Sequence, residues 1–145
     1  MQNGNGVTTT IDNTKLLKSA LSQLVSRHLE IGIPDDSPNN EREDSNLTNS
    51  QIGYIIEVGA PEDNRPASPF LVPGMENAIP GDIQLIKTHL MHVLQLKTSP
   101  TPEIHELLDE VGDYSVEQIK AEITTLGHVV TGQLRDSITY EIIKD

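Results

Sequence analysis

The stretch on which the predicted fold depends is residues 55–78, IIEVGAPEDNRPASPFLVPGMENA, which includes the only phenylalanine of the chain, Phe70. Four of the nine prolines lie in it: Pro61, Pro66, Pro69 and Pro73. Each proline fixes φ, lacks a backbone donor and favours extended geometry in the preceding residue, so together they disfavour both helix and central strand. We predict a rigid connector that delivers Phe70 and Leu71 to a core or to a partner surface. The alternative is an ordinary proline-rich surface loop.

The segment before this connector contains a predicted helix and a predicted strand. Apolar residues recur at helical spacing over residues 13–28, with Asp12 or Asn13 available as N-cap. The polar side of this helix is basic, and its basic residues are Lys15, Lys18 and Arg27. This side is either a solvated face or a contact for an acidic neighbour. Residues 29–33, LEIGI, then alternate as a short strand does.

Further elements are expected on both sides of the connector. Residues 51–58 predict a helix that Thr48, Asn49 or Ser50 caps and Gly59 ends. Downstream, we expect a long helix that begins at Pro80-Gly81-Asp82 and a shorter helix over 103–111 that Gly112-Asp113 breaks. A third helix is headed by a capping box of Ser115 and Gln118. A strand through Ile138, Tyr140 and Ile142 follows. Pairing of the two strands gives an α+β fold, a small antiparallel sheet packed by three or four helices.

Composition predicts a single domain over residues 13–145, with a flexible arm at 1–12 and a mobile acidic loop at 34–50. The chain lacks cysteine, so disulfides and cysteine-ligated zinc are excluded. We expect no membrane span and no signal peptide, because no long apolar run is present.

The chain carries a formal net charge of −12, with 22 acidic residues against 10 basic ones. Such a surface disfavours tight binding to DNA, although weak repulsion suits a channel through which DNA slides. Residues 30–63 contain nine acids and one base, Arg42. The acids of the predicted loop are candidates for facing such a channel: Asp35, Asp36, Glu41, Glu43 and Asp44.

The patterns that mark enzymes are absent: the chain has no phosphate-binding glycine loop, dinucleotide fingerprint or nucleophile elbow. His89 and His92 share a helix face, but a metal would need a further ligand from elsewhere, so we predict no metal, no cofactor and no catalytic residues. The acids at 106, 109, 110 and 113 are interpreted as a hydrated helix face.

Three segments together resemble the neck and tail-completion proteins of tailed bacteriophages. Residues 48–75, TNSQIGYIIEVGAPEDNRPASPFLVPGM, resemble the helix, glycine and proline-arginine-proline-phenylalanine turn of that family. Residues 131–142, TGQLRDSITYEI, resemble its closing threonine-glycine turn and last strand, and LEIGI resembles its first strand. Two departures are Ser68, where the family commonly has arginine, and residues 126–130, which replace a longer insertion.

The resemblance implies a structural virion protein, assembled in the host cytoplasm, that forms a ring of six or twelve copies in the phage neck. Adjacent portal, head-closure or tail-tube and terminator proteins would be its partners, and DNA would pass through its channel. The implied contacts to subunits or partners are Arg65, Pro66, Pro69, Phe70, Leu71 and Pro73, with Lys15, Lys18 and Arg27 as a second patch. Gly59, Thr131 and Gly132 would form backbone turns.

Two alternatives remain from the sequence. Within the same family, a tail terminator or completion ring uses the same kind of small α+β subunit. From another class, a small acidic interaction protein that mimics DNA would share the charge but not the ring.

Overall fold

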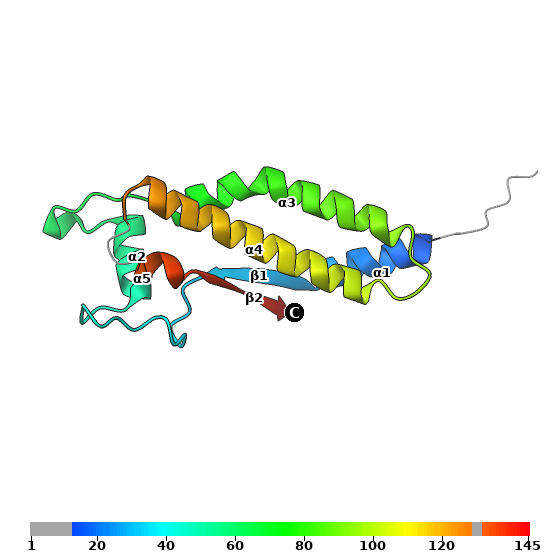
Figure 1. Ribbon diagram of the computed structural model, residues 1–145, viewed down its shortest axis with the longest axis horizontal. Coiled ribbons are helices and arrows are strands. Elements are labelled where there is room, and N and C mark those ends of the chain that lie inside the picture. Colours follow the sequence, from blue (N-terminus) through cyan, green and yellow to red (C-terminus); the bar gives the residue numbers. More distant parts are fainter. Residues whose placement is uncertain (1–12, 129–131) are drawn as a thin grey trace, which may run out of the picture.

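The computed structural model describes residues 13–128 and 132–145. Over these residues the chain forms an α+β fold with a small two-stranded antiparallel sheet packed against helices, as predicted (Figure 1). In chain order the elements are α1 (Thr14–Val25), β1 (Arg27–Gly32), α2 (Asn49–Val58), the 3₁₀ turn η1 (Pro61–Asp63), α3 (Leu71–Val93), α4 (Thr101–Thr125), α5 (Gln133–Asp136) and β2 (Thr139–Lys144). The predicted arm at 1–12 lies outside the described residues.

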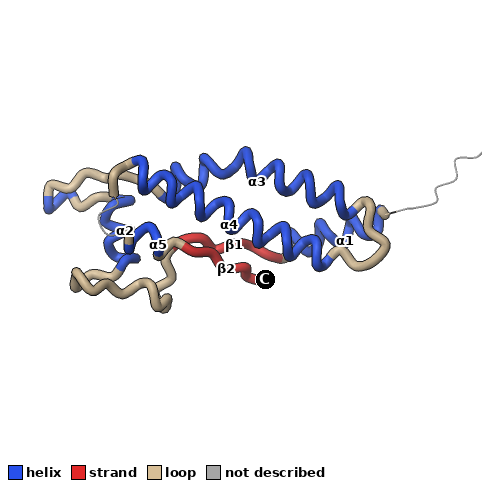
Figure 2. The backbone as a smooth tube through the Cα atoms, in the orientation of Figure 1, coloured by secondary structure: helices blue, strands red, loops and turns tan. Residues whose placement is uncertain are grey.

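Two long helices form the body of the molecule. α3 and α4 pack side by side as an antiparallel hairpin, and α4 lies between α3 and the sheet (Figures 1 and 2). α1 packs against both long helices near the turn of the hairpin, whereas α2 and α5 contact each other at the opposite end. The molecule is therefore elongated, with different elements at its two ends (Figure 2).

The two predicted strands pair with each other, as expected. Leu29 lies opposite Ile142 and Ile31 opposite Tyr140, so the apolar side chains of both strands share one sheet face, which packs on the helices. β1 begins two residues earlier than predicted because α1 ends at Val25. Arg27 therefore lies in β1 and not on the helix, and its guanidinium donates to the carbonyl of Gln23 at 2.9 Å.

The start of α3 differs from the prediction. The helix begins at Leu71 and runs through Pro80, where the sequence predicted its first turn. Pro80 is exposed, so the hydrogen bond that it cannot donate is lost on the side of the helix where water can replace it. The connector is correspondingly shorter than predicted, since residues 55–58 belong to α2 and residues 71–78 to α3.

The two short helices predicted around Gly112 are a single helix, α4. Gly112 continues the helix because the ring of Tyr140 covers it, and a Cβ at this position would lie 2.5 Å from a ring carbon. Ser115 is therefore inside the helix and caps nothing; its hydroxyl donates instead to Asp82 of α3 at 3.1 Å. Burial against the sheet thus overrides the helix-breaking signal of Gly112-Asp113.

The buried core side chains are aliphatic apart from Phe70, and the half-buried ring of Tyr140 packs against them. One cluster of buried side chains comprises Phe70, Val116, Ile119, Ile123, Leu134 and Ile138. A second cluster, nearer the hairpin turn, comprises Ala20, Val93, Ile104, Leu107 and Leu108. Both clusters draw on α4, which explains why this helix holds the fold together.

Candidate functional site

The proline-rich connector, now residues 59–69, forms an extended segment at one end of the molecule (Figure 1). Ala60 and Arg65 exchange backbone hydrogen bonds of 2.8 and 3.0 Å, which close a tight turn around η1. Gly59 has φ +79°, and a Cβ there would lie 2.7 Å from the backbone nitrogen of Ala67. The prediction that Gly59 occupies a conformation that side chains disfavour is confirmed.

The predicted interface residues of the connector separate into two groups. Arg65, Pro66 and Pro69 are exposed, whereas Leu71 and Pro73 are half-buried. Phe70 is only 3% exposed and packs inside the first core cluster. The side chain of Phe70 is therefore a core residue in this structure, so it leaves the predicted interface set, and the connector delivers it to the core.

The C-terminal turn is described in part. Gly132 has φ +81° and precedes α5 as its N-cap, a left-handed conformation that side chains disfavour. Thr131 lies outside the described residues. Leu134 and Ile138, which follow the turn, enter the core beside Phe70, so the turn and the connector meet at one end of the molecule.

The acidic segment is a hydrogen-bonded loop between β1 and α2. Arg42 binds both carboxylate oxygens of Asp44, at 2.9 and 2.8 Å, and donates to Asn49 at 2.8 Å. Asn49 in turn donates to the carbonyl of Asn39 at 2.7 Å. The hydrogen bond from Arg42 lowers the pKa of Asp44 below its usual value. The predicted channel-facing acids all lie exposed on this loop: Asp35, Asp36, Glu41, Glu43 and Asp44.

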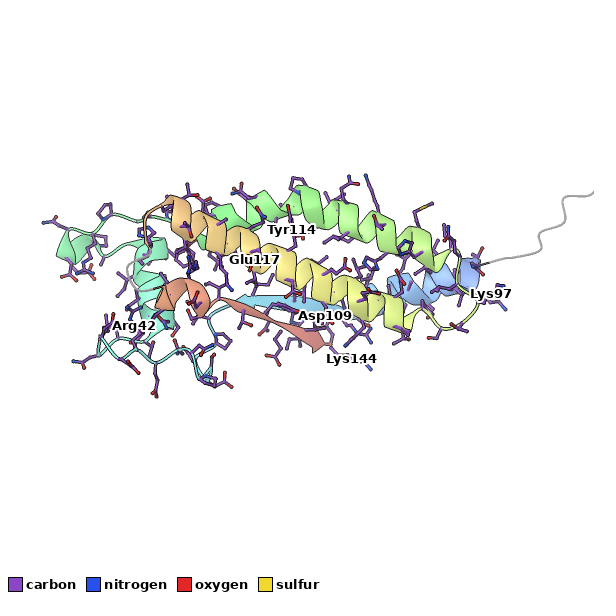
Figure 3. The ribbon with its side chains drawn as sticks, viewed as in Figure 1. Arg42, Lys97, Asp109, Tyr114, Glu117 and Lys144 are labelled. Atoms are coloured by element: carbon purple, nitrogen blue, oxygen red, sulfur yellow. The ribbon has the colours of Figure 1, made fainter. Side chains whose placement is uncertain are left out.

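Basic residues gather at the other end. Lys15 and Lys18 are exposed on α1, and Lys97 is exposed in the turn of the hairpin. Figure 3 shows Arg42 of the acidic loop near one end of the molecule and Lys97 near the other. The sequence did not group Lys97 with Lys15 and Lys18, because only the tertiary structure places the start of α1 at the turn of the hairpin, where Asn13 donates to the carbonyl of Leu96 at 2.9 Å.

An apolar stripe runs along the exposed side of α3. Its members are between 37% and 57% exposed, and their separations of seven, four, three and eight residues place them on one side of the helix. The stripe comprises Val72, Ile79, Ile83, Ile86 and Leu94. Half-exposed apolar side chains gathered on one side of a helix form a candidate interaction surface.

A cluster of histidines and glutamates joins α3 to α4. His89 is 4% exposed, and its Nδ1 lies 2.7 Å from Oε1 of Glu103 while its Nε2 lies 3.1 Å from Oε2 of Glu110. Nδ1 of His92 lies 2.9 Å from the same Glu103 oxygen. The two imidazole rings meet edge to face with centroids 5.8 Å apart.

The cluster changes the protonation of its members. Burial lowers the pKa of His89, but the hydrogen bonds to Glu110 and Glu103 outweigh burial and raise the pKa overall. Burial raises the pKa of Glu103, and the hydrogen bonds from His92 and His89 outweigh it, so that its pKa is lowered overall. Ionised carboxylates only accept hydrogen bonds, so with both glutamates ionised His89 donates from both ring nitrogens as an imidazolium.

The sequence pattern predicted the proximity of only two of the four members of this cluster. The spacing of His89 and His92 predicted that they share a face, but Glu103 is not adjacent until the hairpin closes. Glu110 belongs to the set interpreted as a hydrated face, and one of its oxygens instead reaches His89. Asp109, from the same set, accepts a hydrogen bond from the Tyr140 hydroxyl at 3.0 Å and lies on the sheet side of α4 (Figure 3).

Comparisons with known proteins found no counterpart: no family model, no curated protein and no solved structure matches this chain. None of the helices over residues 13–128 and 132–145 is long and apolar enough to cross a membrane.

Proposed function

We propose that this chain is a structural subunit of the bacteriophage neck, a ring-forming protein that joins the head and portal side of the virion to the tail. Successive copies contact each other head to tail around a channel that admits DNA. The proposal rests on the resemblance of residues 48–75 and 131–142 to that family, together with the distribution of surface chemistry.

The observation that carries the ring is the separation of unlike patches. A closed ring made by rotation requires two different, complementary surfaces on each subunit. The basic patch of Lys15, Lys18 and Lys97 and the acidic loop at 34–48 lie at opposite ends of an elongated molecule (Figures 1 and 3). The acidic loop of one copy therefore complements the basic patch of the next.

The apolar stripe supplies the second contact. We assign it to a second copy of this chain: neighbouring copies overlap at their unlike ends, and the overlap covers part of the exposed side of α3. Charged contacts at the rim set the register of such an interface, whereas buried apolar side chains supply its affinity. The acidic excess of the remaining surface suits a channel wall, since repulsion keeps DNA from binding during passage.

Light scattering after size-exclusion chromatography tests the assembly. We expect the wild-type chain to form multimers that dissociate as salt rises, because salt screens the end-to-end charges. Ile79→Glu with Ile83→Glu should give monomers with an unchanged circular dichroism spectrum. Thr88→Glu is the control, since Thr88 is exposed and, nine residues after Ile79, lies on the opposite side of α3. It should leave the multimer intact.

Two outcomes would contradict the proposal. A wild-type chain that stays monomeric at high concentration and competes with DNA for a DNA-binding enzyme would favour the acidic DNA mimic. Electron microscopy of purified particles tests the location of the chain. Absence of the chain from the junction of head and tail would rule out the neck assignment. Density for it in a terminator ring would assign the subunit to the tail instead.

A further inference from the structure

We propose that His89, His92 and Glu103 bind one divalent transition-metal ion, such as Zn²⁺, between α3 and α4. The ligand atoms are Nδ1 of each histidine and a carboxylate oxygen of the glutamate. The candidate ligand atoms of these three residues all lie within 4.8 Å of one another. The cluster joins the end of α3 to the beginning of α4 across the turn of the hairpin.

The distances require only a small adjustment. Tetrahedral zinc with bonds of about 2.0–2.1 Å holds its ligand atoms about 3.3 Å apart. The Glu103 oxygen now lies 2.7 Å from His89 and 2.9 Å from His92. Opening each contact by roughly half an ångström makes room for the ion. The His92 side chain is 55% exposed, so it has room to rotate toward this arrangement.

Glu110 supplies the feature that separates this cluster from a fortuitous group of polar side chains. A histidine that binds a metal commonly donates its other ring N–H to a carboxylate, which orients the ring and sets the tautomer. His89 Nε2 lies 3.1 Å from Oε2 of Glu110, so this partner is already present. With the proton held on Nε2, the Nδ1 lone pair of His89 points toward Glu103 and His92.

Charge and donor type define the ion. Two carboxylates surround the cluster, so a dication neutralises them, taking the place of the proton on His89 Nδ1. Two imidazole nitrogens and one carboxylate oxygen favour zinc, cobalt, nickel or copper, whereas magnesium and calcium prefer oxygen ligands alone. Because the His92 side chain is 55% exposed, a fourth coordination position beside it would be open to water.

Titration of the full chain with zinc, after treatment with chelator and dialysis, tests the site. We expect calorimetry to show one high-affinity Zn²⁺ per chain, a melting temperature that rises with zinc but not with magnesium, and tetrahedral d–d absorption with Co²⁺. His92→Ala removes a ligand that is largely exposed and should weaken zinc binding by more than about tenfold while the circular dichroism spectrum is unchanged. Glu110→Gln should weaken it by about tenfold through loss of the outer carboxylate.

The matched control is His28→Ala, because His28 is an exposed histidine that also lies between two carboxylates, those of Asp145 and Glu30. This variant should bind zinc as the wild type does. Failure of the wild type to bind zinc, or equal loss of binding in His28→Ala and His92→Ala, would overturn the site. If His92→Ala does not fold, Glu103→Gln provides the same comparison. None of these measurements depends on assembly into a ring, so the site and the proposed function are tested separately.

Discussion

The carboxylate of Glu57, near the end of α2, accepts hydrogen bonds from the backbone N–H groups of Phe70 and Leu71, both at 2.8 Å. Its other oxygen accepts from the N–H of Val72 at 3.2 Å. The first N–H groups of a helix have no partner within the helix, and a negative charge there also interacts favourably with the helix dipole. Glu57 therefore caps α3 from another helix, thirteen residues away in sequence from Phe70.

Glu57→Ala should destabilise the protein by about 1–2 kcal/mol, because three N–H groups lose their acceptor next to the buried ring of Phe70. Urea denaturation measures the change in the free energy of unfolding. Glu62→Ala is the control, since Glu62 is exposed on η1, and it should change stability by less than about 0.5 kcal/mol. Equal effects of the two variants would show that the cap contributes little.

Gly74→Ala should destabilise the protein although alanine is the better helix former. A Cβ at Gly74 would lie 2.6 Å from Cα of Ile119, so α3 and α4 would have to move apart. We expect a net loss of about 1–3 kcal/mol, larger than the gain of about 1 kcal/mol from helix propensity. The control is Gly32→Ala, because nothing lies within 4 Å of the added Cβ. Thermal melts in which Gly74→Ala matches or exceeds the wild type would refute the close packing.

Asp82→Asn should stabilise the protein at neutral pH. Oδ2 of Asp82 accepts from Ser115, but its buried Oδ1 finds no donor among the described residues. Burial, which outweighs the Ser115 hydrogen bond, raises the pKa of Asp82. A raised carboxyl pKa means that ionisation costs stability as pH rises above the unfolded value of about 3.9.

The advantage of Asp82→Asn at pH 7 should therefore disappear as the pH falls below about 4. Melting temperatures measured across this range give the difference between variant and wild type. Asp113→Asn serves as the control, since Asp113 is exposed on α4. A difference that grows on acidification would have the wrong sign and would contradict the assignment.

The phenol of Tyr140 should ionise at a higher pH than an ordinary tyrosine does. Burial, together with the hydrogen bond to Asp109 and the charges of Asp109 and Asp113, raises its pKa to about 12. Because the folded pKa is above the unfolded value of about 10, this residue supports folding below that value and the support is lost as pH rises further. Ultraviolet titration should resolve one late phenolate, which Tyr140→Phe removes.

Local patterns predicted several elements correctly. The apolar spacing of α1 and the alternation in both strands were sufficient, because one face of each element is buried. The start of α2 follows from a capping box, in which Thr48 and Gln51 bind each other's backbone N–H. The same spacing at Ser115 and Gln118 gave a wrong prediction of a helix start, because these residues lie inside the continuous helix α4.

The sequence by itself determined the local features of this protein: an aliphatic core, helices and strands with one apolar face, an acidic surface, and turns at Gly59 and Gly132. Those features depend on residues close together in the chain. Three features depend on the tertiary structure. The ring of Tyr140 covers Gly112, and α4 continues there without a break. Glu57 caps α3 at a start nine residues before Pro80, and Glu103 contacts His89 and His92. Each is a contact between segments distant in sequence, and its free energy outweighs the local preference that predicted otherwise.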